Sequence, residues 1–355
     1  MRDGLLAVGT VADLELRQRV RSTAWYVLLG VSAALLLVVS LLLLGVAAAV
    51  GREGGQQVFS VVVFFVLLLG SLVTPALSGG AVNGDRDAGT LATTQVTLVT
   101  TPQLVLGKFL AAWTASLAFL AVSVPFLLLA VVAGGVDPVV VLVALPVTVL
   151  ELGVVAAIGV GLSSLIQRTV FSVVTTYLVV AALSIGTLIA FGLGGLAFQT
   201  RIDVISRSYP DGSYTDDGDL KPGATCTTSR GTDVVPRFDR VWPLLALNPY
   251  VVLADAVPSR WDRFGDAVDT FGSVKAGLRA AQVVPDDPRT DDSCGGTALS
   301  TGVPEDSPQG LVERTAPGWF VGLGLQLLLG TAALVGGGLA LRTPARRLAR
   351  GSRIA

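Results

Sequence analysis

The stretch Ala76–Phe109, ALSGGAVNGDRDAGTLATTQVTLVTTPQLVLGKF, decides the fold because it separates two long apolar runs and carries charges that those runs lack. A membrane-spanning helix needs about 20 mainly apolar residues. Six runs of the chain meet that requirement: Ala24–Val50, Val58–Leu77, Leu104–Ala133, Val139–Leu165, Val170–Phe198 and Gly318–Leu341. The first resembles a signal peptide around Ala47-Ala48-Ala49, but it is about twice as long as a usual signal core, so we expect a retained span.

The bulk composition supports the same class of protein. The 355 residues are 52% hydrophobic and 14% charged, with a mean hydropathy of +0.71, whereas soluble domains carry about 25% charged residues. We therefore predict an all-α polytopic membrane protein with six transmembrane helices.

The basic residues predict the orientation, because cytoplasmic loops carry an excess of Lys and Arg. With the N-terminus inside, twelve basic residues face the cytoplasm, and only Arg52 lies in the two short outside loops. The inside set is Arg2, Arg17, Arg19, Arg21, Arg86, Lys108, Arg168, Arg342, Arg346, Arg347, Arg350 and Arg353. We expect both termini in the cytoplasm (N-in/C-in).

These spans divide the chain into five parts. They are a cytoplasmic N-terminal interfacial segment (1–23), helices 1–5 with a cytoplasmic loop at 78–103 (24–198), an extracytoplasmic domain (199–317), helix 6 (318–341) and a basic cytoplasmic tail (342–355). In the first part, Thr10 and Asp13 are expected to cap a short helix.

The insertion of about 120 residues between helices 5 and 6 differs in composition, with 18 acidic and 12 basic residues. It holds both cysteines, Cys226 and Cys294, and an oxidising location favours a disulfide over two free thiols. Its apolar stretch Val241–Val257, which contains Asn248, Pro249 and Tyr250, is too short and too Pro-interrupted to span. A re-entrant or surface-lying outer segment is expected there.

Two nucleotide-binding patterns in the opening stretch are incomplete. A P-loop requires a first Gly and a hydroxyl after the Lys, but Pro102 and Phe109 hold those positions around Gly107-Lys108. The run Leu77–Gly80 resembles the start of an ABC signature, with Ala81 in place of the usual Gln. The chain also has no histidine, which excludes His-based triads and His-ligated metals. We expect no enzyme activity, no metal site and no catalytic residues.

The order of residues in this loop resembles type-2 ABC exporter permeases. The matching residues are Asp85, Arg86, Asp87, Gly89, Thr90, Leu91, Pro102, Gly107 and Lys108. Six spans, a charged N-terminal segment and an Asn-Pro pair before the last span are also similar to the family. Ala92 stands where the family has an acidic residue, and the outer insertion is longer than usual.

The resemblance implies the membrane-spanning subunit of an ABC exporter in a bacterial inner membrane, acting in efflux. It would pair with a second permease copy or a homologue, within membrane lipid and without nucleic acid. A separate ATPase subunit would bind ATP and Mg, with no cofactor in this chain, and residues 85–108 would be its coupling loop. The alternative is a non-transporting mechanotransmitter or scaffold whose outer domain binds a partner.

Three charged residues leave two interpretations each. Glu151, in the middle of span four, is either part of a translocation path or proton relay, or a protonated Glu bonded to Thr148 or a neighbouring helix. Asp255 is a weaker case of the same kind. Lys108 either belongs to the coupling loop or extends its amine to anionic lipid headgroups.

Overall fold

The structure is a computed structural model, and it describes residues 2–50, 54–89, 100–210, 212–213, 215, 219–294 and 307–341. Thr90, Leu91 and the basic tail 342–355 lie outside the described residues.

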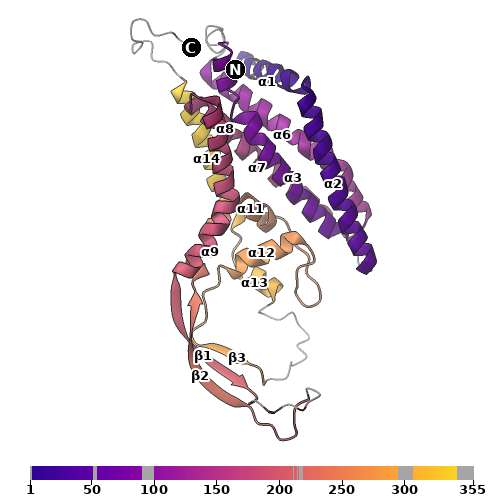
Figure 1. Cartoon of the computed structure of the whole chain (residues 1–355), viewed down its shortest axis with the longest axis vertical. Helices are drawn as coiled ribbons and strands as arrows, with labels where there is room; N and C mark the ends of the chain where they lie inside the picture. Colours follow the sequence, from indigo (N-terminus) through magenta and orange to yellow (C-terminus); the bar gives the residue numbers. More distant parts are fainter. Residues whose placement is uncertain are drawn as a thin grey trace.

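Among the described residues, six helices are long and apolar enough to cross a membrane, as a multi-pass membrane protein requires. They are α2 (Thr23–Val50), α3 (Gly55–Ser78), α6 (Thr101–Val132), α7 (Pro138–Leu165), a composite of α8 (Thr169–Ala181), η1 (Ala182–Gly186) and α9 (Thr187–Ala197), and α14 (Trp319–Ala340). Each lies within a few residues of an expected span. Figure 1 shows them side by side along the long axis of the molecule.

Two further helices lie at the end of this bundle where α3 ends and α6 begins, which we call the α1 end. They are α1 (Arg2–Val20) and α4 (Asn83–Asp87). The expectation that Thr10 caps a helix is wrong, because Thr10 lies inside α1 and its hydroxyl donates to the Leu6 carbonyl (2.8 Å). The start of α6 is as expected, with Pro102 in its first turn and the Gln103 side chain accepting from the Thr100 N–H (2.8 Å).

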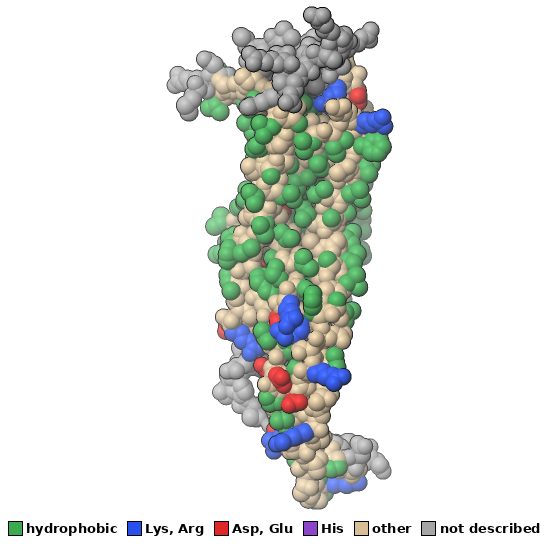
Figure 2. All heavy atoms as spheres, turned by 90° about the vertical axis from the view of Figure 1, so that its left-hand side faces the viewer, with side chains coloured by type: hydrophobic (Ala, Val, Ile, Leu, Met, Phe, Trp, Pro, Cys, Tyr) green, Lys and Arg blue, Asp and Glu red, His purple; other side chains and the backbone are tan. Residues whose placement is uncertain are grey.

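The centre of the bundle is α7, which packs against α3, α6, α8, α11 and α14. Small residues let α14 approach it closely: a Cβ on Gly161 would lie 2.4 Å from the Ala333 backbone. Figure 2 shows hydrophobic side chains over the middle of the molecule and charged ones toward its two ends. This distribution is the one that a hydrocarbon layer around the bundle favours.

The segment between α9 and α14 contains a sheet, so the all-α prediction is wrong there. The sheet has the order β2-β1-β3, formed by β1 (Gln199–Ser208), β2 (Thr227–Pro236) and β3 (Arg289–Asp292). The strand β1 pairs antiparallel with β2 and parallel with β3. It buries Ile202 and Val204 on alternate positions, which is the period-2 pattern of a half-buried strand. The sheet projects away from the bundle (Figure 1), and we call this the sheet end.

Short helices fill the space between the sheet and the bundle. They are η2 (Phe238–Arg240), α10 (Pro243–Ala246), α11 (Pro249–Ala256), α12 (Thr270–Ala280) and α13 (Pro308–Arg314). The apolar stretch that was expected to be re-entrant or surface-lying forms the helix pair α10–α11, and its burial contradicts the surface-lying alternative. Its residues Val252, Leu253 and Ala254 are fully buried in the same core as α3 and α7.

A disulfide between Cys226 and Cys294 joins the start of β2 to the residues after β3, with the two Cα atoms 6.0 Å apart. The bond closes a loop with a sequence separation of 68 residues. A crosslink over a loop of this length stabilises a fold by about 2–4 kcal/mol, mainly by restricting the unfolded chain.

We predict that replacing both cysteines with serine lowers the stability of the sheet by that amount while the bundle stays intact. Limited proteolysis of the purified protein, with and without reductant, checks this. Cleavage in 199–294 should speed up in the variant and in the reduced wild type alike. Unchanged cleavage in both would contradict the prediction.

Candidate functional site

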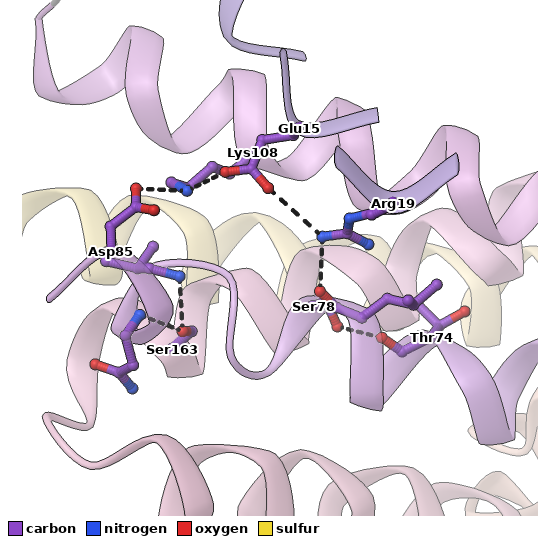
Figure 3. A network of polar contacts seen from close by, with 10 residues as sticks. Glu15, Arg19, Thr74, Ser78, Asp85, Lys108 and Ser163 are labelled. Atoms are coloured by element: carbon purple, nitrogen blue, oxygen red, sulfur yellow. Dashed lines mark hydrogen bonds and ion pairs between the residues drawn. The ribbon is translucent and has the colours of Figure 1, made fainter. Parts of the chain in front are cut away.

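A buried lysine joins three elements at the α1 end. The Lys108 side chain, on α6, is 1% exposed, and its Nζ contacts Asp85 Oδ2 of α4 (2.7 Å) and Glu15 Oε1 of α1. Figure 3 shows Lys108 between the two carboxylates, with Arg19 beyond Glu15. We call Glu15, Asp85 and Lys108 the Lys108 cluster. The expectation that Lys108 extends to lipid headgroups is wrong, because its amine is enclosed and paired.

The neighbouring glycine explains why a Gly-Lys pair stands here. A Cβ on Gly107 would lie 2.6 Å from Val11 Cβ and 3.1 Å from the Val8 carbonyl oxygen. Only glycine therefore lets α1 lie this close to α6 and bring Glu15 over Lys108. The pair resembles part of a P-loop in sequence, but in the structure it is a helix–helix contact.

The second nucleotide-like pattern, Leu77–Gly80, is also a packing feature. A Cβ on Gly159 of α7 would lie 1.9 Å from Ser78 Oγ, and one on Gly79 would lie 2.9 Å from the Val173 Cα of α8. Small residues at the end of α3 thus allow three helices to meet.

The three charges of the loop, Asp85, Arg86 and Asp87, face different partners. Asp85 faces Lys108, Arg86 donates to the Asn83 side chain within α4, and Asp87 accepts from the Thr169 hydroxyl at the start of α8 (2.5 Å). On α4, Gly84 and Asp87 are exposed, while Asp85 and Arg86 are partly exposed. Gly89 ends this segment with a φ of 70°, a conformation that favours glycine.

A groove of about 540 Å³ lies beside the cluster, between α1 and α4. Its lining includes Glu15, Arg19, Leu77, Gly84 and Asp85. One nitrogen of the Arg19 guanidinium donates to the Leu77 carbonyl (2.8 Å), while another, Nη1, is buried without a partner. A cationic side chain therefore lines the groove, with its unpartnered nitrogen buried.

We predict that Lys108→Met loosens α1 and α4 from α6, because it leaves two carboxylates facing each other without their cation. Breaking a buried ion pair costs about 3–5 kcal/mol, and the partial exposure of both carboxylates reduces this to roughly 1–3 kcal/mol. Thermal unfolding in detergent, followed by hydrogen exchange of residues 2–20, measures the effect. The matched control is Arg17→Met, which removes an exposed α1 ion pair with Asp13. It should change neither the unfolding temperature nor the hydrogen exchange of residues 2–20. Equal behaviour of the two variants would contradict the role of Lys108.

A second polar site lies in the middle of the bundle, around the turn between α10 and α11. We call Ala246–Tyr250 the re-entrant tip. The Tyr250 hydroxyl bonds Ser71 of α3 (3.3 Å), and the Leu247 carbonyl accepts from Gln326 Nε2 of α14 (2.9 Å). Ser71 and Gln326 are both interior positions of long helices, so the tip reaches well into the bundle.

Asn248 fixes the tip to span five at its irregular turn. Its side-chain oxygen caps α11 by accepting from the Tyr250 N–H (2.9 Å). Its amide nitrogen donates to the Ser184 carbonyl and to the Thr187 hydroxyl (2.5 and 2.9 Å). Ser184 lies in η1, a π-helical turn. Such turns leave carbonyls without their usual helical partners and often occur at functional sites.

Glu151 lies on α7 next to this tip and is 1% exposed. Its Oε1 has no hydrogen-bond partner, and the Thr148 hydroxyl donates instead to the Ala144 carbonyl (2.8 Å). The Thr148 hydroxyl therefore does not donate to Glu151. The side chain faces protein and not lipid, and Tyr250 lies within electrostatic range of it.

Asp255 has a structural role at the sheet end of the bundle. Its carboxylate accepts from the Gly318 and Trp319 N–H groups that start α14 (2.7 and 2.9 Å) and from Arg279 Nε of α12 (2.8 Å). Negative charge at a helix N-terminus is stabilising. Asp255 therefore fixes the start of α14 to α11 and α12, which disfavours a role in a translocation path.

The other end of α12 is fixed to α3. Asp269 caps α12 by accepting from the Gly272 N–H (2.7 Å) and also accepts from Gln56 of α3 (2.6 Å). Burial raises the pKa of Asp269 above its ordinary value. Lys275 donates to the Val257 carbonyl (2.5 Å), and burial lowers its pKa to about 8.

The lowered pKa of Lys275 gives a stability prediction with a definite sign. Between about pH 8 and pH 10.5 the folded protein has released this proton and the unfolded chain still holds it. The unfolded state then binds more protons, so the free energy of unfolding rises with pH in this window, by a total on the order of 1–3 kcal/mol. The unfolding midpoint of wild type minus that of Lys275→Met should increase between pH 7.5 and 9.5. A flat or falling difference would contradict it.

No protein-family model matches the chain, and a search of curated proteins finds no match. The residues that sequence reasoning missed are Glu15, Asn83, Arg279 and Gln326, which act through contacts between distant segments. A signal was available for one of them: Gln326, like Lys108, is a polar residue within a mainly apolar helix, and such residues usually have a partner in the bundle.

Proposed function

We propose that the chain is the membrane-spanning permease subunit of an ABC exporter, powered by ATP hydrolysis on a separate subunit. The observation that carries the proposal is the Lys108 cluster, which ties α1 and α4 to the first turns of α6. A force on the surface of α4 or α1 is thereby transmitted to a spanning helix through buried ionic contacts.

The position of this cluster agrees with the proposed orientation. The excess of basic residues favours a cytoplasmic location for the α1 end, and in this proposal a soluble ATPase has access there to α1, α4 and the groove between them. In this proposal the ATPase binds ATP and Mg, and the exposed parts of Arg86, Asp87 and Arg19 are the groups that it contacts. Charge-assisted hydrogen bonds make such a contact strong and directional.

In this proposal transport uses a second permease unit, because side chains fill the core between the described spans. The interior of this chain is packed with side chains from α3, α6, α7 and α14. We propose that the path forms between two copies, or between this chain and a homologue, in the inner membrane of a bacterium.

A second function is favoured by the projecting sheet. Its strand β2 is exposed over most of its length, and the disulfide fixes its start. A rigid outer extension of this kind suits a mechanotransmitter, in which ATP hydrolysis inside alters how the sheet holds a partner outside. Substrate-dependent efflux from vesicles separates export from this alternative.

We predict that Arg86→Glu weakens association with the ATPase at least tenfold, because it places a third negative charge beside Asp85 and Asp87. The measurement is the amount of P-loop ATPase that co-purifies with the tagged chain in mild detergent. The control is Arg263→Glu, the same charge reversal on an exposed residue at the sheet end, which should retain the ATPase. Full retention by Arg86→Glu, with normal insertion, would show that α4 is no docking surface.

A further inference from the structure

The Glu151 carboxyl occupies the least favourable place for a charge in the bundle. It stands near the middle of the 28-residue helix α7, and its side chain is 1% exposed with an unpartnered Oε1. Isolated carboxylates in a low-dielectric interior are strongly disfavoured relative to their protonated form.

The helices around α7 bring no free cation to Glu151. Of the elements packed on it, α3, α8, α11 and α14 contain no Lys or Arg, and Lys108 of α6 is engaged with Glu15 and Asp85. The titratable groups on these elements are Tyr250 and Asp255 of α11 and Tyr177 of α8. Asp255 is bonded to Arg279 and to the start of α14, and Tyr177 donates to the Leu72 carbonyl. Tyr250 lies within electrostatic range of Glu151.

The re-entrant tip closes the surroundings of this carboxyl. Tyr250 contacts α3 through Ser71, while Gln326 of α14 holds the Leu247 carbonyl and keeps its own Oε1 buried and unpartnered. Packing of Ala157 against Gly330 and of Gly161 against Ala333 places Gln326 near the level of Glu151. Two acceptor oxygens, Glu151 Oε1 and Gln326 Oε1, are therefore buried at this level without a donor among the described residues. A proton on Glu151 would supply one.

We propose that Glu151 is a proton-binding site that the re-entrant tip closes. With the tip seated, the carboxyl holds a proton. When the tip withdraws from α3, α7 and α14, water enters, the O–H bond breaks and the proton passes to water, leaving a carboxylate. Seating of the tip is thus linked to uptake of one proton. The proposal goes beyond ATPase coupling and does not depend on it, because it concerns the isolated chain.

Infrared difference spectroscopy of the purified protein tests the first half. At pH 7.5, wild type minus Glu151→Gln should show the C=O band of a protonated carboxylic acid. The matched control, wild type minus Glu313→Gln, replaces an exposed carboxylate of α13 and should show carboxylate bands only. Carboxylate bands for Glu151 at this pH would overturn the proposal.

Asn248→Asp tests the second half. Aspartate can still cap α11, but it loses the donors to Ser184 and Thr187 that hold the tip. The infrared spectrum of Asn248→Asp minus that of the double variant Asn248→Asp/Glu151→Gln isolates the Glu151 carboxyl. The ionised fraction of Glu151 in this difference spectrum should be at least tenfold higher than in wild type. Tyr250→Phe, which removes only the Ser71 contact, should give a smaller rise in the same direction and serves if Asn248→Asp does not fold. If the C=O band of protonated Glu151 is the same in the folded variants as in wild type, the tip does not close the site.

Discussion

The burial of one ammonium group organises the α1 end of this protein. Lys108 stands on a helix that is otherwise apolar for most of its length, and an enclosed charge needs partners of opposite sign. Glu15 and Asp85 supply them from segments on either side in the sequence. The same contacts settle where α1 lies, how α4 is turned, and why Gly107 precedes the lysine. The proposed coupling route consists of these contacts.

Polar backbone imposes the corresponding constraint in the middle of the bundle. The re-entrant tip is non-helical at Asn248, so its backbone and the π-helical turn of span five need hydrogen bonds that water cannot provide in hydrocarbon. The Asn248 side chain accepts from the Tyr250 N–H of the tip and donates to the Ser184 carbonyl of span five, and Gln326 donates to the Leu247 carbonyl. Helix α12 then connects the start of α3, through Asp269, to the start of α14, through Arg279 and its partner Asp255 of α11. Movement of the re-entrant tip would therefore change its contacts with three spanning helices, namely α3, span five and α14.

The sequence predicted the six helices to within a few residues, because the thickness of the hydrocarbon layer sets a length that apolar runs must match. It did not predict the sheet, since Ile202 and Val204 are a short alternation within a polar segment. It could not predict the Lys108 cluster, because Glu15 and Lys108 are 93 residues apart and meet only through the packing of α1. Glu151 was recognisable as an isolated charge, but its neighbour Tyr250 was not.

The central claim is that buried contacts of Lys108 transmit ATP hydrolysis to the permease, and ATP turnover in liposomes tests it most directly. The partner ATPase is assayed with wild type, Lys108→Met and Arg17→Met chains. The account predicts that all three bind the ATPase and that only Lys108→Met loses permease-stimulated hydrolysis. Full stimulation by a folded Lys108→Met chain would contradict it.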